Sequence, residues 1–509
     1  MLLAVLGAAL ACTRTGAPLD TGSNPPENPA QFSTPPFAES FSPSADPTAF
    51  QPATATPAGQ PTAFSTPTLD PTRFFSMPTL GPGSYTVQSG DTIGSIAWRF
   101  GVAVEALINV NSLANPNALE IEQVLLIPVP DSETQGPNFK IIPDSELVYG
   151  PVEHDFSVAE FLKGRQSYLA GYRETVVGLE RSGAEIVDYV AWHYSVNPRM
   201  LLAVLEYRSH WISSTSPSED QKVWPILHIE GKPYLYKQLA WVADQLNSGY
   251  YKWKAGGGDY WFLADGTQIR SGSGINAGTA GVQNLMAQMY TRADWEIAVT
   301  QDGFFQTYQS MFGYPFSWAL EPIVPATLVQ PALILPFEPG VIWYFTSGPH
   351  GGWGSGSAFA ALDFGPGDVD SGCLLQSNYW VTAAAPGLVV RSEEGGVVLD
   401  LDMDGNEQTN WVLFYMHIET RDRVAKGTVL KAGDRIGHAS CEGGVSNGTH
   451  VHFARKFNGE WISAEGPVPL VLDGWVASNG GREYDGYLKR DSVSIEAKGW
   501  SAEDNIIQR

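Results

Sequence analysis

Two histidines in one short segment constrain this chain more than any other feature of its sequence. Residues 449–453 read Thr-His-Val-His-Phe, so polar and apolar side chains alternate as they do in a β-strand with one buried face. On such a strand His450 and His452 point to the same side, about 7 Å apart. Val451 and Phe453 point to the other side, into a core. Two imidazoles on one face and hydrocarbon on the other indicate a metal centre better than a solvated surface.

Three further candidates lie upstream in the same part of the chain. His350 begins a Gly/Ser-rich stretch, Asp363 follows it in Leu-Asp-Phe, and His417 ends an apolar, strand-like run. A catalytic zinc ion takes three protein ligands from imidazole nitrogen or carboxylate oxygen and keeps a fourth position for water, whose pKa it lowers to about 7. His350, Asp363 and His452 would supply such a set. His417 and His450 remain to move a proton or to stabilise a developing oxyanion.

Four short motifs occur together between residues 337 and 470. They are Leu-Asp-Phe at 362–364, Tyr-Met-His at 415–417, Val-Leu-Lys-Ala-Gly-Asp at 429–434 and Gly-Thr-His-Val-His-Phe at 448–453. With them, this stretch resembles the zinc metallopeptidases of the lysostaphin and β-lytic type, which cut peptide crosslinks of bacterial peptidoglycan. The resemblance implies an antiparallel, β-rich domain. It also implies that His350, Asp363 and His452 bind Zn²⁺, while His417 and His450 serve catalysis.

The spacing of the first two ligands distinguishes two branches of that family. In the lysostaphin branch a histidine precedes the aspartate by four residues, and Phe359 stands at that position here. In the β-lytic branch the histidine precedes the aspartate by thirteen residues, as His350 precedes Asp363. The resemblance therefore implies an intact, β-lytic-like site. The alternative is a catalytically silent wall-binding regulator, and the complete ligand set favours the enzyme. His438 is interpreted as a structural histidine.

Residues 84–130 have the pattern of a small, separate module. Tyr85 and Val87 indicate a strand, two apolar helical segments follow, and residues 124–127 close the module as a second strand. This pattern resembles the LysM module, a βααβ fold that binds N-acetylglucosamine chains. By that resemblance two loops line the sugar groove, with the residues Gly90, Asp91, Thr92, Asn109 and Asn111. For Asn111, a role as a turn former is the alternative.

The amino-terminal region indicates export. Residues 1–12 form an apolar run that is too short to cross a bilayer, fits a secretion signal and ends in a lipobox-like Ala-Leu-Ala-Cys. Cys12 is therefore a candidate for lipidation. Residues 13–83 are rich in Pro, Thr and Ser and cannot bury a core, so we expect a disordered tether. These segments predict an exported protein of the cell envelope or medium, held to the membrane only through a lipid anchor.

Residues 150–325, beyond a linker at 131–149, have the pattern of a helical domain. Asn197 and Pro198 predict the start of a helix that reaches Glu206. This helix and a later small-residue segment are distantly similar to lysozyme-like transglycosylases, in which a buried glutamate is the acid. The serine that usually follows that glutamate is displaced here. We interpret the domain as inactive or glycan-gripping; a helical spacer and a muramidase with Glu206 as its acid are the alternatives.

The net charge of the chain narrows the classes of molecule that it can bind. The chain carries 54 acidic against 30 basic side chains, a net charge of −24, which argues against nucleic acid as a partner.

Residues 398–405 imitate a calcium loop, but Trp411 stands where such a loop needs a bidentate glutamate. We interpret this segment as a hairpin turn between two strands. Residues 471–509 are interpreted as β extensions packed on the peptidase.

The cysteines predict a disulfide. If Cys12 carries lipid, Cys373 and Cys441 are the two that remain, and thiols tend to pair outside the reducing cytosol. A bond between them would tie together the two segments that supply the proposed metal ligands. It would close a loop of 68 residues, worth about 4 kcal/mol on the chain-entropy model. Two buried free thiols are the alternative.

The sequence thus predicts a multidomain α+β protein. A βααβ LysM module, a mainly helical middle domain with a lysozyme-like alternative, and an antiparallel β-rich zinc peptidase domain at 326–509 follow one another. The expected activity is hydrolysis of peptidoglycan, by zinc-dependent cleavage of peptide crosslinks in a wall whose glycan the LysM module binds. The alternatives are the silent regulator and a bifunctional muramidase and endopeptidase that uses Glu206. The expected partners are the glycan chains and the stem or bridge peptides of peptidoglycan.

Overall fold

The computed structural model describes residues 83–88, 91–100, 104–113, 115–116, 118–127, 135–153, 155–367, 372–373 and 376–509. The predicted signal segment with Cys12, the tether up to residue 82, and Gly90 lie outside these described residues. The chain divides into two compact units, Met1–Thr62 and Ala63–Arg509, and every described residue belongs to the second. In the part that the structure describes, no helix combines the length and the apolar character needed to cross a membrane.

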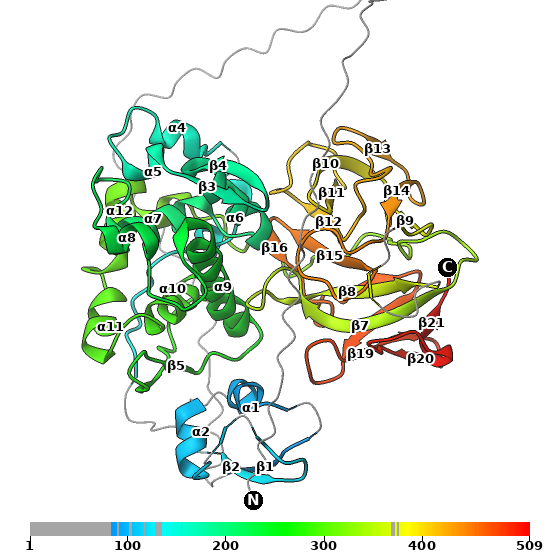
Figure 1. Ribbon diagram of the computed structural model, residues 1–509, viewed down its shortest axis with the longest axis horizontal. Helices are drawn as coiled ribbons and strands as arrows, with labels where there is room; N and C mark the ends of the chain where they lie inside the picture. Colours follow the sequence, from blue (N-terminus) through cyan, green and yellow to red (C-terminus); the bar gives the residue numbers. More distant parts are fainter. Residues whose placement is uncertain are drawn as a thin grey trace, which may run out of the picture. The chain divides into compact units, whose positions relative to one another are not determined.

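The first described module has the βααβ order that the sequence predicts. Strand β1 (Gly83–Thr86) pairs antiparallel with β2 (Val124–Ile127), and helices α1 (Ile93–Phe100) and α2 (Val104–Val110) lie between them in the chain (Figure 1). A small core of its own joins these elements, with Ile96, Leu107 and Leu125 fully buried. The module is therefore organised around its own side chains.

Residues 135–325, called the helical domain below, are mainly helical, as predicted for residues 150–325, and also contain two short hairpins. The elements are α3 (Asp144–Leu147), α4 (Val158–Leu162), α5 (Tyr168–Gly171), β3 (Arg173–Val176), β4 (Leu179–Ser182), α6 (Gly183–Tyr194), α7 (Pro198–Ser209), α8 (Glu219–Val223), α9 (Tyr234–Lys254), β5 (Tyr260–Phe262), β6 (Gln268–Arg270), α10 (Ala277–Ala287), α11 (Arg292–Ala298) and α12 (Phe304–Phe312). Helix α7 begins where predicted, because the Asn197 side chain accepts a hydrogen bond from the Arg199 amide just ahead of Pro198.

Helix α9 is the longest helix among the described residues and packs closely against α10. A Cβ atom on Gly249 would lie 2.5 Å from the carbonyl oxygen of Ala280, so the close approach requires glycine. Ile141, Ile142 and Leu147 are fully buried in the same core. This part of the expected linker at 131–149 is thus packed into the helical domain.

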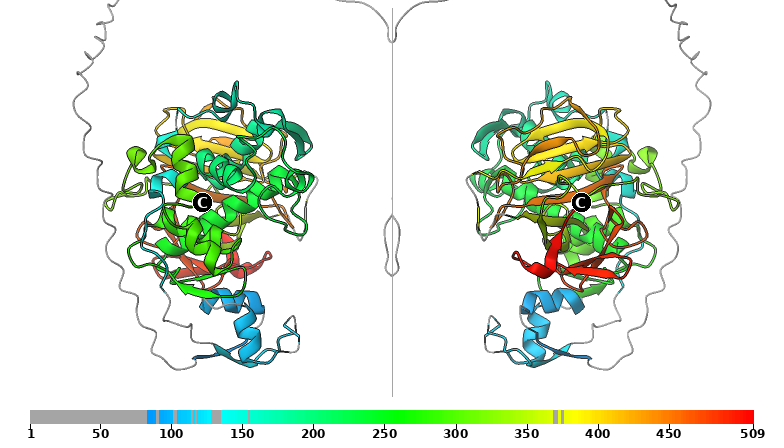
Figure 2. Two further views of the ribbon diagram at one scale, coloured as in Figure 1. Left: turned by 90° about the vertical axis from the view of Figure 1, so that its left-hand side faces the viewer. Right: turned by 90° about the vertical axis from the view of Figure 1, so that its right-hand side faces the viewer.

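The carboxy-terminal domain is built on a nine-stranded antiparallel sheet, as counted over the described residues (Figures 1 and 2). Its strand order is β13-β10-β11-β12-β15-β8-β7-β21, with β16 added beside β15. The bounds are β7 (Trp343–Gly351), β8 (Phe359–Pro366), β10 (Gly387–Glu393), β11 (Gly396–Asp400), β12 (Trp411–Met416), β13 (Val429–Leu430), β15 (Val451–Phe457), β16 (Glu460–Trp461) and β21 (Ile506–Ile507). Residues 401–410 connect β11 to β12, so the calcium-like segment leads into a hairpin connection, as predicted.

The tail forms a second, smaller sheet. Strands β17 (Val471–Leu472), β18 (Trp475–Asn479), β19 (Gly486–Arg490) and β20 (Val493–Glu496) pair in sequence order. The last strand, β21, then pairs with β7 of the large sheet. A further two-stranded sheet pairs β9 (Trp380–Thr382) with β14 (Arg435–His438).

The two faces of the large sheet have different neighbours. One face carries Leu413 and Phe453, which belong to the core of the carboxy-terminal domain itself. The other face carries Phe414 and Ala454, which belong to one buried cluster with the helices of the helical domain. Because side chains alternate along a strand, Ala454 lies on the same face of β15 as His452. The helical domain therefore packs on the face of the sheet that carries the candidate ligand.

Polar contacts also join the helical domain to the sheet. Glu460 of β16 accepts a hydrogen bond from the Tyr250 hydroxyl at 2.9 Å and lies 2.7 Å from the Lys254 ammonium. Glu394, in the turn between β10 and β11, forms an ion pair with Arg181. These contacts occur beside the shared apolar cluster, so the interface combines hydrophobic burial with paired charges.

Candidate metal centre and active site

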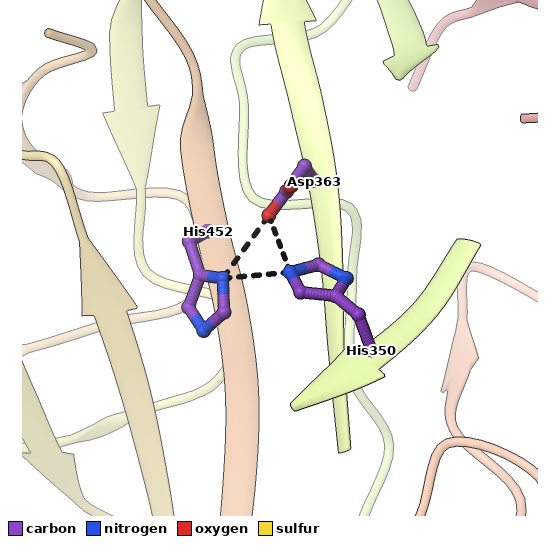
Figure 3. A group of neighbouring side chains, drawn as sticks. All are labelled: His350, Asp363 and His452. Carbon is purple, nitrogen blue, oxygen red and sulfur yellow. Dashed lines mark hydrogen bonds and ion pairs between the residues drawn. The ribbon is translucent and has the colours of Figure 1, made fainter. Parts of the chain in front are cut away.

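Strand pairing brings the three predicted ligands together from three neighbouring strands. His452 of β15 is the pairing partner of Asp363 on β8, and His350 of β7 pairs with Ala361 two residues before that aspartate. The register of β7 shifts on both sides of His350, as it does at β-bulges, and a bulge re-aims the side chain that it carries. His350 and Asp363 lie thirteen residues apart in the chain, yet both point into one site with His452 (Figure 3).

The three ligand atoms form a compact triangle. His350 Nε2 lies 3.0 Å from His452 Nδ1 and 3.2 Å from Asp363 Oδ1, and His452 Nδ1 lies 3.1 Å from the same oxygen. In a tetrahedral zinc site with bonds of about 2.0–2.1 Å, two ligand atoms lie about 3.3 Å apart. The distances between the three donor atoms are therefore close to those between three ligand atoms of a tetrahedral zinc site. The donor types, two imidazoles and one carboxylate, also fit a catalytic metal.

Backbone carbonyls orient both imidazoles toward this triangle. His350 donates from Nδ1 to the Gly348 carbonyl at 2.9 Å, and His452 donates from Nε2 to the Gly352 carbonyl at 3.0 Å. Because a carbonyl oxygen only accepts, each ring carries its proton on the outer nitrogen and presents the other as a lone pair. This is the arrangement by which outer-shell groups prepare histidines for metal binding.

The charges in the site suit a bound cation. Burial alone would raise the pKa of Asp363, but His350 and His450 hold the pKa of this carboxyl well below its usual value, so it is ionised. Burial lowers the pKa of His452, so that ring is neutral. For His350 burial also lowers the pKa, but Asp363 more than offsets this and the net shift is upward. A cation and a proton therefore compete for His350.

His417 and His450 lie beside the triangle, His417 directly after the end of β12 and His450 directly before the start of β15. The two rings stand 4.3 Å apart, and His450 Nε2 lies 3.8 Å from Asp363 Oδ1. His417 donates from Nδ1 to the Glu442 carbonyl, and His450 from Nδ1 to that of Gly448. Burial lowers the pKa of His417 to about 3, with a further contribution from the neighbouring histidines, so the ring is neutral.

Sequence reasoning missed two aromatic residues of the site. Tyr484, from the tail, stacks on the His350 ring at 4.6 Å, and its backbone carbonyl accepts from the Gly348 amide. Trp353 packs edge-on against Phe414 beside the ligands. Only the pairing of the tail with β7 places Tyr484 here, and the sequence offers no local signal for that. The Gly-Trp-Gly within the loop after His350 was a visible signal for Trp353.

Several other predicted residues have structural contacts of their own. Glu206 accepts from the backbone amides of Ile212 and Ser213, just beyond the end of α7. The Asn111 side-chain amide joins α2 to β2 through three hydrogen bonds with the backbone of Leu107 and Leu126, as the turn-former alternative anticipates.

The remaining predicted residues are placed as follows. Asp91 accepts from the Tyr85 hydroxyl and the Gln88 amide, and Thr92 and Asn109 are exposed. Cys373 and Cys441 form a disulfide with their Cα atoms 5.8 Å apart. His438 is buried in β14 against Trp380. The Asp400, Asp402 and Asp404 carboxylates gather in the calcium-like turn, where they accept from backbone amides of the same turn.

Family models match three separate parts of the chain. A model described as a LysM domain matches residues 85–128, one described as the LasA N-terminal domain matches residues 140–324, and one described as peptidase family M23 matches residues 373–464. The last range holds His417, His450 and His452 and begins after His350 and Asp363.

Two curated relatives and one solved structure are similar to parts of this chain. Protease LasA of Pseudomonas aeruginosa is 26% identical over 332 residues, which cover 60% of this chain and 74% of the relative. The β-lytic metalloendopeptidase of Lysobacter enzymogenes is 28% identical over 155 residues, covering 30% of this chain and 83% of the relative. The structure of pseudoalterin, an M23 metalloprotease from the deep sea, is 24% identical with a TM-score of 0.29 and covers 35% of this chain and 99% of that chain.

These matches agree with the arrangement of the site. The LysM match coincides with the βααβ module, and the M23 match covers His417, His450 and His452. The match to β-lytic metalloendopeptidase agrees with the resemblance that the sequence motifs around His350 and Asp363 imply. The chain is therefore a LysM-containing peptidase of family M23, of the lysostaphin and β-lytic type.

Proposed function

We propose that this chain is a peptidoglycan hydrolase in which a zinc-dependent endopeptidase cuts peptide crosslinks of the bacterial cell wall. The M23 match and the relatives named as a protease and a metalloendopeptidase support the peptidase activity. The LysM match supports the wall as the location of the substrate, through binding of its glycan. The observation that carries the proposal is the triangle of ligand atoms from His350, Asp363 and His452.

Zinc in this triangle would supply a Lewis acid for the scissile carbonyl and a water of lowered pKa. The chain's own residues do the rest. Ionised Asp363 and the imidazoles of His350 and His452 would hold the cation, while the carbonyls of Gly348 and Gly352 orient these two imidazoles. The positions of the ligands on three paired strands keep this geometry rigid.

His417 and His450 handle the proton that must pass from the attacking water to the leaving amine. In both rings Nδ1 is committed to a backbone carbonyl, which leaves Nε2 as the atom that takes up or releases a proton. A ring that has taken up this proton is a cation and also stabilises the oxyanion of the tetrahedral intermediate. Burial keeps His417 neutral, so its Nε2 carries a lone pair that can accept a hydrogen bond from the attacking water.

The proposal gives Glu206 no chemical role. Its carboxylate is occupied by two backbone amides and lies 3.5 Å from His210, so its contacts account for its position at the helix end. The silent-regulator alternative requires a lost ligand set, and the triangle is complete. We also propose that the protein is exported and carries lipid at Cys12. Fatty-acid labelling of cells that express the wild type and Cys12→Ala tests the anchor.

Products released from defined peptidoglycans test the function. Mass spectrometry of digests should show new amino termini in the stem or bridge peptides, dependent on added Zn²⁺ and absent with His452→Ala. New reducing or anhydro sugar ends would instead identify a glycan-cleaving enzyme, with Glu206 as the candidate for its catalytic acid. Release of neither kind of fragment by the metal-loaded protein would leave the silent regulator as the better assignment.

A further inference from the structure

The loop between two metal ligands reaches across to the helical domain. Residues 352–358 connect β7, which carries His350, to β8, which carries Asp363, and their sequence is Gly-Trp-Gly-Ser-Gly-Ser-Ala. Three glycines in seven residues leave this loop without a strong conformational preference of its own. Contacts with other parts of the chain must therefore define its shape.

Asp244 of α9 binds the tip of this loop with both carboxylate oxygens. Oδ1 accepts from the Gly356 amide at 2.8 Å, and Oδ2 accepts from the Ser355 hydroxyl at 2.7 Å. A carboxylate that accepts from a backbone amide makes a charge-assisted bond, which is stronger than a neutral one. Helix α9 belongs to the helical domain, and the loop belongs to the peptidase domain.

The backbone of the loop packs so closely against helix α9 that side chains at two of its glycines would clash with the helix. A Cβ atom on Gly356 would lie 2.0 Å from the Asp244 carbonyl oxygen, and one on Gly354 would lie 2.7 Å from Asp244 Oδ1. Trp353 adds an apolar contact, since its ring lies 4.6 Å from that of His193 in α6. The conformation of the loop tip therefore depends on the surface of the helical domain.

The same loop supplies a group that orients a metal ligand. The Gly352 carbonyl accepts from His452 Nε2, and the Gly352 amide donates to the Ala358 carbonyl, which closes the base of the loop. The Trp353 amide donates to the Ser357 hydroxyl inside it. A hydrogen-bonded path thus runs from Asp244, through a loop of seven residues, to the outer nitrogen of His452.

We propose that Asp244 is a positioning residue for the metal centre, through which the helical domain raises metal affinity. By fixing the loop tip it holds the Gly352 carbonyl in place, and that carbonyl fixes the His452 tautomer and ring direction. Loss of an outer-shell partner of a metal-bound histidine typically weakens metal binding about 10- to 100-fold. Asp244 acts one step further out, so the expected loss lies at the lower end of this range. The inference rests on the proposed metal site.

Metal affinity of the full chain tests this inference. Competition with a chromophoric chelator measures the dissociation constant for Zn²⁺, and the visible absorption of bound Co²⁺ reports the ligand geometry. Asp244→Ala should weaken Zn²⁺ binding about tenfold and change the Co²⁺ spectrum. Asp244→Asn should bind almost as the wild type, because an amide still accepts from the Gly356 amide and donates to the Ser355 hydroxyl.

Two further variants separate the explanations. Arg181→Ala removes the ion pair with Glu394 at the same interface without touching the loop, and should keep wild-type affinity. If it weakens binding as much as Asp244→Ala does, general loosening of the interface is responsible and the inference is overturned. Wild-type affinity in Asp244→Ala, with circular dichroism showing an unchanged fold, would also overturn it. His452→Ala should abolish Zn²⁺ binding. If the affinity of this variant for Zn²⁺ is unchanged, the proposed metal site and the proposed function are both contradicted.

Discussion

The imidazole rings of His417 and His450 lie 4.3 Å apart, although 33 residues separate them in the chain. Strand β12 ends at Met416, which pairs with His452, and His417 then takes a positive φ of 66°. Residues other than glycine adopt this left-handed region only uncommonly, and such conformations cluster at functional sites. The turn directs the ring toward His450 rather than along the strand.

Replacing either histidine should separate catalysis from metal binding. Neither ring belongs to the triangle of ligand atoms, so His417→Ala and His450→Ala should each bind Zn²⁺ as the wild type does. A general acid or base contributes about 10²- to 10⁴-fold to rate, so each variant should lose at least about 100-fold in kcat. Steady-state hydrolysis of a crosslink peptide, with metal content measured on the same samples, checks this.

His438→Ala is the matched control for those two variants. This histidine is also buried in the peptidase domain, but it packs against Trp380 in the two-stranded sheet. The change should lower thermal stability and leave kcat per folded, metal-loaded molecule unchanged. If His417→Ala keeps the kcat of His438→Ala, His417 has no place in the mechanism.

A buried pair of carboxyl groups in the helical domain predicts a pH-dependent stability. Burial, with the nearby Glu146 as a second cause, raises the pKa of Glu153 from its ordinary value of 4.5 to about 8. Arg199 and Asn197 contact one oxygen of Glu153, and the other finds no hydrogen-bond partner among the described residues. Since the folded state holds a proton that the unfolded state releases, this stabilisation is complete below about pH 4.5 and is lost as pH rises toward 8.

Glu153→Gln should flatten this dependence. Glutamine stays neutral at both pH values. The unfolding free energy of the variant minus that of the wild type should therefore be larger at pH 8 than at pH 5, by more than about 1 kcal/mol. Urea unfolding at several pH values, compared as wild type minus variant, removes the contribution of all other groups. Glu160→Gln is the control, since its exposed side chain pairs only with exposed Lys163. Equal pH slopes for wild type and Glu153→Gln would contradict the prediction.

The sequence was most informative where a local pattern decides the structure. Alternation around His450 and His452 predicted a strand with one buried face, which the structure places at Val451–Phe457, just after His450, and the Asn197–Pro198 pair predicted the start of α7. The three candidate ligands could be named because each lies in a short motif of recognisable spacing. Both kinds of signal extend over a few residues, which is why they can be read without the fold.

What the sequence did not predict depends on contacts between distant segments. Tyr484 reaches His350 only because the tail lies along β7, and Asp244 reaches the ligand loop only because α9 packs on the sheet. Asp244 lies in a helix with no motif around it, so nothing local marks it. The sequence likewise did not predict that the helical domain packs on the sheet face that carries the candidate site, because the apolar side of a helix does not show which sheet it will pack against.

Removal of the disulfide should weaken the peptidase domain and leave its ligands in place. The Cys373–Cys441 bond closes a loop of 68 residues that contains β9 to β14 and His417. The chain-entropy model gives about 4 kcal/mol for such a loop. The double change Cys373→Ser, Cys441→Ser should therefore lower the unfolding free energy by up to about that amount. An unchanged midpoint in urea, or equal stability of the wild type with and without reductant, would contradict this.

Access to the site should depend on the helical domain. His350, Asp363 and His417 are only 4%, 7% and 4% exposed, and the apolar face beside them is buried against helices. From this enclosure we predict that a peptide crosslink reaches the ligands only in a minor, open state. When only a fraction of molecules is competent, apparent activity falls by that fraction, and minor states are typically about 0.1–10% populated. Separation of the domains should raise the rate on the order of tenfold or more.

A cleavable linker measures this directly. Val329 lies between the two domains and is 78% exposed, so a recognition sequence for a specific protease can be inserted there. Arg181→Ala and Lys254→Ala, which remove cations from the interface, should help the cut domains to part. Rates on a soluble crosslink peptide, with Zn²⁺ in excess to offset any loss of affinity, are compared before and after cleavage, with gel filtration to verify separation. Equal rates for the intact chain and the separated peptidase domain would show that the helical domain leaves the site open to substrate.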